Sequence, residues 1–231
     1  NEDINLGWHH QARIGLQSTD LAAGKSLGYQ LSWLSEKGFG DAEHLTLFTL
    51  KLDAMLGIEG GDQVIAAAKA EDFYRLSKQF TFYTKLQYDQ RSRNYLDQPL
   101  DLGGETGLRG YPVQYQQGTQ RWLSTAELRW YPQITLYQML DVGFVAFADA
   151  GRASGGDIQL AAPSVAGIRS DADLLIPNEA EQWIGSVGLG TRFYSSRSSN
   201  NHVIHVDLSK PVGGATEVNS WEIQLKVEQR F

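Results

Sequence analysis

The residue types that most often carry catalysis occur in this chain as one short motif. Gly24-Lys25-Ser26-Leu27-Gly28 has the G-x-S-x-G spacing of a nucleophilic serine, which attacks acyl groups when it sits on a strand-to-helix turn. Alternating polar and apolar residues on both sides predict a hairpin here instead, so we expect no catalytic residue. The motif is not a phosphate-binding loop either, because Thr19 stands where the first glycine would be.

The candidate metal ligands are also too few for a site. His9 and His10 are adjacent, so they would point to opposite faces of a strand. His205 and Asp207 would share a face, but two ligands do not make a closed site. The chain has no cysteine, which excludes thiolate sites and disulfides. We therefore expect no metal, no cofactor and no enzymatic activity.

Composition excludes one partner and leaves the fold class open. The 231 residues carry a formal net charge of -7, which argues against nucleic-acid binding. Charged residues make up 20% of the chain and the mean hydropathy is -0.34. No run of about eighteen apolar residues is present, so no transmembrane helix is predicted. A transmembrane β-strand exposes only alternate residues to lipid, so these values also fit a membrane barrel.

Two-sided alternation is the strongest pattern in the sequence. Near the C-terminus, Ile223, Leu225 and Val227 fall on one face of a strand, while Gln224 and Lys226 fall on the other. The same contrast recurs along the chain and predicts ten antiparallel strands. Their approximate ranges are 4–18, 26–35, 44–58, 63–75, 79–91, 120–131, 140–151, 183–195, 202–209 and 221–231.

The lengths of these segments favour a membrane barrel. Several run for twelve residues or more, whereas strands in soluble sheets have about five or six residues. Strands of the greater length suit an oblique crossing of a bilayer. Tryptophan and phenylalanine tend to fall near the strand ends, as in interfacial girdles. We predict an all-β fold, with residues 1–231 forming a single antiparallel transmembrane β-barrel domain. A soluble β-sandwich that binds a ligand is the alternative from another class.

Two connections are long, covering about 92–119 and 152–182. If the last strand ends at the periplasmic rim, counting strands backwards places both connections on the extracellular side. Outer-membrane barrels show this asymmetry between long outer loops and short inner turns.

The first long connection carries a motif that resembles a known family. It contains Leu102-Gly103-Gly104 and then Arg109-Gly110-Tyr111. Here the chain resembles the Omp85 superfamily, also called the bacterial surface antigen family, whose hallmark is an Arg-Gly-Phe or Arg-Gly-Tyr loop folded into the barrel lumen. Five predicted strands follow the loop, as they do in that family. The resemblance therefore implies that residues 92–119 fold into the lumen.

Two further segments resemble the family and supply partners for the arginine. Ala126-Glu127-Leu128-Arg129 resembles its acidic strand, and Phe147-Ala148-Asp149-Ala150-Gly151 resembles its Phe-x-Asp-x-Gly strand. The resemblance implies that Arg109 reaches the carboxylates of Glu127 and Asp149. A guanidinium in a confined space also requires an acidic partner of matching geometry.

The neighbours of Arg109 have expected roles as well. Gly110 would permit a tight turn, and Tyr111 would pack against Phe147. The alternative is that Arg109 is an ordinary loop arginine and that Glu127 and Asp149 are solvated residues of the lumen wall.

The resemblance implies a larger barrel of about sixteen strands. We expect these ten to be its last ten strands, and a small complete member of the family is the alternative. The segment Glu2-Asp3-Ile4-Asn5-Leu6-Gly7 resembles one in members without periplasmic POTRA domains or with a patatin-type lipase. Ile223, Leu225, Val227 and Phe231 would form the C-terminal signal read by the barrel assembly machinery.

The resemblance implies an integral protein of the Gram-negative outer membrane. Its expected role is to insert or translocate proteins or lipids, with the Arg-Gly-Tyr loop locked in the lumen. Expected partners are outer-membrane lipid and lipopolysaccharide, the barrel assembly machinery, and a client protein or lipid. The alternative within the same fold is a passive pore or the anchor barrel of a patatin-like lipase.

Overall fold

The structure is a computed structural model, and it describes residues 6–20, 25–57, 62–92, 99–137, 140–155, 182–195, 202–213 and 220–229. The fold is all-β, with one short 3-10 helix. The elements are β1 (Trp8–Asp20), β2 (Lys25–Gly40), β3 (His44–Leu56), β4 (Gln63–Arg75), β5 (Phe80–Ser92), β6 (Leu100–Leu102), η1 (Gly104–Thr106), β7 (Gln116–Gly118), β8 (Gln120–Leu136), β9 (Leu140–Ser154), β10 (Ile184–Ser195), β11 (His202–Val212) and β12 (Glu222–Gln229).

The ten long strands form one antiparallel sheet in the order β1-β2-β3-β4-β5-β8-β9-β10-β11-β12. This confirms the prediction of ten antiparallel strands. A separate hairpin, β6 with β7, lies in the connection between β5 and β8. Each long strand therefore pairs with its neighbour in sequence, apart from this insertion. In the described residues β1 and β12 are the two edges of the sheet, and no pairing joins them.

Several strands run further than the sequence predicts. β2 continues to Gly40, because residues 36–40 still alternate although Lys37 lies on the otherwise apolar face. β8 continues to Leu136 past Pro132 through an irregularity between Trp130 and Ile134. β6 and β7 were not predicted, since strands of three residues are too short to show a period.

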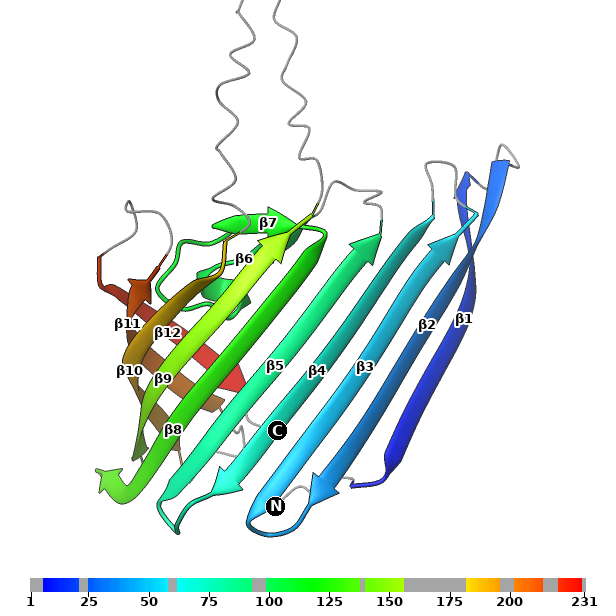
Figure 1. The fold of residues 1–231 in the computed structure, drawn as a ribbon. Helices are drawn as coiled ribbons and strands as arrows, with labels where there is room; N and C mark the ends of the chain where they lie inside the picture. Colours follow the sequence, from blue (N-terminus) through cyan, green and yellow to red (C-terminus); the bar gives the residue numbers. More distant parts are fainter. Residues whose placement is uncertain are drawn as a thin grey trace, which may run out of the picture.

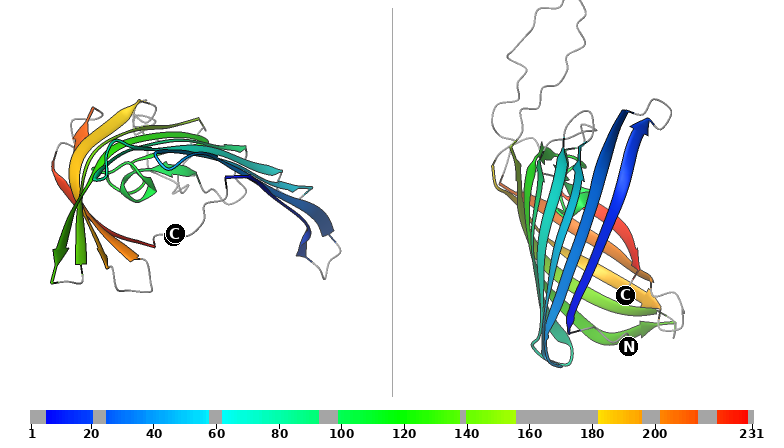
Figure 2. Two further views of the ribbon diagram at one scale, coloured as in Figure 1. Left: turned by 90° about the horizontal axis from the view of Figure 1, so that it is seen from below. Right: turned by 90° about the vertical axis from the view of Figure 1, so that its right-hand side faces the viewer.

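The sheet is strongly curved along one half (Figures 1 and 2). β8 to β12 curl round towards the C-terminal end, whereas β1 to β4 form a flatter wing. β6, β7 and the segment between them lie on the concave side. We call the concave side the inner face and the convex side the outer face.

The outer face is apolar and exposed. Ile14 is 83% exposed, Ile223 74% and Leu189 65%, although a soluble protein would cover side chains of this kind. The inner face carries the ion pairs of Arg109, Arg121 and Arg129, and strand alternation separates these polar side chains from the apolar ones. In the part of the chain that the structure describes, all ten long strands lie in one sheet and not in the two packed sheets of a sandwich.

The buried apolar cluster lies between the inner face and the 99–119 connection. Leu102, Leu108 and Tyr111 come from the connection. They pack on the side chains that β8, β9 and β10 turn inward, which are Leu123, Ala153 and Ile184. The core therefore fixes the connection, including β6, to the inner face of the ten-stranded sheet.

The long connections leave the same edge of the sheet. β5 and β9 run in the same direction, so the segments that follow them start at one edge, opposite the short turns 41–43 and 76–79 (Figure 1). The structure does not describe parts of both long connections, at 93–98 and 156–181, or the ends of the chain, at 1–5 and 230–231. Phe231, which we predicted to belong to the C-terminal signal, therefore lies outside the described residues. In the described part of the chain, no helix is long and apolar enough to cross a membrane.

Candidate functional site: the Arg-Gly-Tyr loop on the inner face

The loop from residue 99 to 119 folds back on itself through backbone hydrogen bonds. The Gly104 amide donates to the Tyr111 carbonyl at 2.9 Å, and the Leu108 amide donates to the Gly103 carbonyl at 3.2 Å. Gly110 has φ +84°, a conformation that residues with a side chain rarely adopt. A Cβ at Gly110 would also lie 3.2 Å from the Ser209 hydroxyl on β11. Glycine therefore allows both the turn and the close approach to the wall.

Arg109 projects from this turn to Asp149 on β9. Its Nε lies 2.7 Å from Asp149 Oδ2 and its Nη2 lies 2.8 Å from Oδ1. The contact is a bidentate pair, which is the strongest geometry a guanidinium can make with a carboxylate. The Asp149 side chain is fully buried, so the pair is shielded from solvent.

The remaining guanidinium nitrogen of Arg109 faces two more carboxylates. Arg109 Nη1 lies 2.9 Å from Glu127 Oε1 on β8 and 3.5 Å from Asp207 Oδ2 on β11. Glu127 also binds Arg129 at 2.7 Å, and Asp207 binds Arg192 at 3.2 Å. The structure thus brings Arg109 together with both predicted partners and adds Asp207.

The charges around Arg109 explain its protonation. Burial alone would lower the pKa of the Arg109 guanidinium, but hydrogen bonds and charge from Asp149, with Glu127 and Asp207, raise that pKa above its ordinary value. The group therefore remains a cation at any physiological pH.

Phe147 lies beneath Arg109. The guanidinium carbon is 3.5 Å from the centre of the Phe147 ring, a cation–π contact on the same side of β9 as Asp149. A side chain at Gly188 on β10 would overlap both this ring and the Leu208 carbonyl on β11, so the glycine leaves space for Phe147 and for the neighbouring strand.

The expected packing of Tyr111 on Phe147 is not what the structure shows. Tyr111 stacks at a tilt on Tyr115, with ring centres 4.9 Å apart, because the turn at Gly110 directs it towards the upper edge of the wall. Its hydroxyl donates to the Gly213 carbonyl at 2.6 Å and also approaches the Gly185 carbonyl at 3.0 Å. Burial raises the pKa of the Tyr111 hydroxyl.

Three polar residues whose contacts were not predicted from the sequence also hold the loop. Gln116 is fully buried and bridges two backbone groups, accepting from the Ala153 amide and donating to the Gln182 carbonyl. Arg121 pairs with Asp89 at 2.7 Å and donates to the Asp101 carbonyl. Gln224 on β12 donates to the Gly104 carbonyl at 3.0 Å.

Little in the sequence could have identified these residues. Glutamines are common in the connection, and Gln116 differs from its neighbours only in its fold-dependent burial. Arg121 and Gln224 do lie on the polar side of their strands, but many residues share that property.

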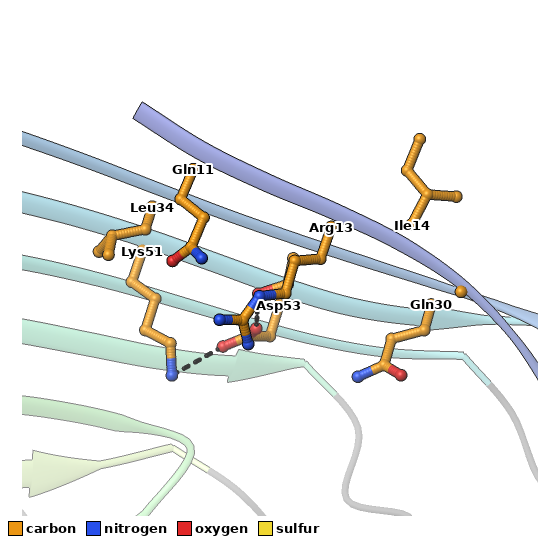
Figure 3. A pocket seen from close by; sticks show the side chains of 9 residues that line it. Gln11, Arg13, Ile14, Gln30, Leu34, Lys51 and Asp53 are labelled. Carbon is orange, nitrogen blue, oxygen red and sulfur yellow. Dashed lines mark hydrogen bonds and ion pairs between the residues drawn. The ribbon is translucent and has the colours of Figure 1, made fainter. Parts of the chain in front are cut away.

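The described residues line a cavity under the loop and another on the flatter wing of the inner face. One of about 150 Å³ lies under the loop, and its walls include Lys85, Thr125, Glu127 and Arg129. The other, of about 430 Å³, lies on the flat wing between β1 and β3. Figure 3 shows Arg13, Lys51 and Asp53 pointing into it and Ile14 pointing away. Asp53 binds Lys51 at 3.0 Å and accepts from Ser32 at 2.6 Å.

The remaining predicted site residues lie elsewhere. Ile223, Leu225 and Val227 are exposed on the outer face of β12. His205 and Asp207 share the inner face, as expected, and Asp207 is occupied by arginines. Among the described residues, no three His, Asp or Glu side chains are grouped as metal ligands.

No protein-family model matches this chain, and no curated protein matches its sequence. The functional interpretation therefore depends on the geometry of the loop and the wall. That geometry provides a buried electrostatic latch. One loop arginine joins β8, β9 and β11 by contacts that would all break together if the loop moved.

Proposed function

We propose that this chain forms the wall of an Omp85-type barrel in a bacterial outer membrane, and that the Arg-Gly-Tyr loop is latched inside the lumen. The barrel would take part in inserting or translocating proteins or lipids, and it would have no catalytic activity. The observation that carries the proposal is the bidentate pair between Arg109 and Asp149 on the face opposite the exposed apolar side chains.

The outer face supports a position in the membrane. Phe80, Trp130 and Phe144 pair across three strands at one end of the sheet, with ring centres 5.4 to 6.0 Å apart. Tyr88 and Trp122 pair at the other end, with ring centres 4.4 Å apart. Aromatic residues at both ends of an apolar band are typical of interfacial girdles.

The spacing of these girdles fits a bilayer. Trp122 and Trp130 are eight residues apart on β8, about 27 Å along a strand at about 3.4 Å per residue. A tilt of about 40° reduces this to a height of about 20 Å, close to the apolar band of about 25 Å in outer-membrane barrels.

The inner face supports a gating role for the loop. Arg109 is held by Asp149 on β9 and by Glu127 on β8. Gln224 on β12 donates a hydrogen bond to the same loop. A client that crosses the lumen next to β8–β12 would have to displace this loop, so the latch would decide when the lumen opens. Lipopolysaccharide and phospholipid would face the outer side chains.

The proposal is tested by reconstituting the full chain in liposomes and measuring two activities in parallel. One is insertion of an unfolded outer-membrane barrel protein, and the other is liposome swelling in small sugars. We expect client insertion above that of empty liposomes, and a change in both activities in Arg109→Ala. Swelling without any client insertion would replace the assembly role with that of a passive pore. Neither activity in correctly inserted protein would contradict both functions.

A further inference from the structure

Among the residues that the structure describes, one cation near the latch, Lys85, has no ion pair of its own. Arg109 is matched by Asp149, Arg129 by Glu127, Arg192 by Asp207 and Lys69 by Glu71. Lys85 on β5 is half-buried on the same inner face. Among the residues that the structure describes, its ammonium group makes no hydrogen bond and no ion pair, and it borders the cavity under the loop.

The register of the sheet places Lys85 in line with Asp149. Lys85 pairs with Thr125 across β5 and β8, and Thr125 pairs with Asp149 across β8 and β9. The three side chains therefore form one row on the inner face. Neighbouring strands are about 4.8 Å apart, so the backbones at the two ends of the row are about 10 Å apart. The four-carbon stem of a lysine can cover most of that distance above a short threonine.

The charges around this row act on the Lys85 ammonium in opposite directions. Asp149, Glu71 and Glu127 attract the Lys85 ammonium, and Arg109 repels it. While Arg109 occupies Asp149, Lys85 is kept off that carboxylate. If the loop left, Asp149 and Glu127 would each lose a buried partner, which is strongly unfavourable. Lys85 would stay, because it belongs to the wall and not to the loop.

We propose that Lys85 is a second counterion for Asp149, which replaces Arg109 when the loop leaves the wall and so makes release of the latch easier. The inference rests on the proposed function, in which the loop moves. It assigns Lys85 a positioning role in the released state. A lysine that merely stabilised the latched state would have the opposite effect on release.

The test uses a thiol as a reporter of loop release. The chain has no cysteine, and Ser209 is fully buried beneath Gly110, so the thiol of Ser209→Cys would react with a water-soluble maleimide only after the loop moves. Val113→Cys, at an exposed loop position, gives the rate without protection. When closing is faster than labelling, the labelling rate reports the population of the open state.

We expect Lys85→Met to slow labelling of the reporter by about tenfold, a change within the usual range for coupled neighbours. Lys85→Arg should keep the original rate, because it retains the charge. Lys69→Met is the matched control, since it removes an inner-face lysine that already has Glu71 as its partner, and it should change the rate little. In an Asp149→Asn background, Lys85→Met should have no effect on the rate.

Two kinds of failure are distinguishable. If Arg109→Ala does not speed labelling, the latch itself is wrong and the proposed function loses its gate. If Arg109→Ala speeds labelling while Lys85→Met leaves the rate unchanged or raises it, the latch stands and the role of Lys85 is overturned. A slowing by Lys85→Met that persists with Asp149→Asn would also overturn it, because another group would then be its partner.

Discussion

Arg109 and Asp149, 40 residues apart in the chain, meet through two parallel hydrogen bonds of 2.7 and 2.8 Å. The pair joins a loop to the middle of a strand, and the Asp149 carboxylate is fully buried. Since a buried charge that loses its partner costs several kcal/mol, this pair makes the position of the loop nearly all-or-none.

Removing the guanidinium should therefore destabilise the protein. We expect Arg109→Ala to lower the free energy of unfolding by about 3–5 kcal/mol, because Asp149 and Glu127 are left uncompensated. The midpoint of thermal unfolding in detergent measures this. Arg75→Ala removes an exposed arginine from the same face and should cost about 0.5 kcal/mol or less. Equal losses in the two variants would contradict a special role for Arg109.

The space for Phe147 gives a second prediction. Gly188→Ala introduces a methyl group that overlaps both the Leu208 carbonyl and the ring on which Arg109 lies, and overpacking of this kind costs about 1–3 kcal/mol. Gly15→Ala is the control, since its added carbon would meet Gln30 only at an ordinary 3.7 Å. Chemical denaturation of both variants measures the difference, and a Gly188 variant as stable as the Gly15 variant would contradict the close packing of Gly188 against Phe147 and β11.

Gln116 should anchor the loop although it carries no charge. In Gln116→Ala the Ala153 amide and the Gln182 carbonyl lose their partner, and an unsatisfied buried group costs about 1–3 kcal/mol. We expect faster proteolysis between residues 99 and 119. Gln117→Ala, on the neighbouring and less buried position, should leave the cleavage rate unchanged. Resistance to proteolysis in the Gln116 variant would exclude it as an anchor.

The loop should tolerate mildly alkaline conditions. The pKa values of Arg109 and Tyr111 are both raised in the folded state, so their stabilisation is complete below the unfolded pKa values and is lost only as pH rises through the folded ones. Because tyrosine ordinarily ionises near pH 10, we expect a constant unfolding temperature from pH 7 to about 9 and a fall above about 10. Tyr111→Phe should weaken that fall. An unfolding temperature that already drops between pH 7 and 9 would contradict this.

Much of the fold was predictable because strand alternation is a local property. Lys69 and Glu71, or Arg129 and Glu127, fall two residues apart on the polar side of their strands, and the structure places each pair on one face. The strand ends were less predictable. Lys37 interrupts the apolar side of β2 but lies over the rings of Trp8 and Phe39, so the strand continues where composition suggests a stop.

The site was predictable only as far as a motif could indicate it. Arg109, Glu127 and Asp149 meet as the Arg-Gly-Tyr resemblance implies. The contacts of Asp207 and Gln224 with the loop were not predicted, because the two residues approach it only when the curvature of the sheet brings β11 and β12 close to the loop. Curvature depends on the summed twist of many strands, which no short pattern encodes.

Contact between the outer face and lipid can be measured directly through the tryptophans. All six tryptophans are exposed, and they are Trp8, Trp33, Trp122, Trp130, Trp183 and Trp221. In liposomes whose lipids carry bromine on the acyl chains, an outer face in contact with lipid predicts that most of the tryptophan fluorescence is quenched, while aqueous iodide quenches little. Strong quenching by iodide with no effect of the brominated lipids would contradict the proposal that this sheet is the wall of a membrane barrel.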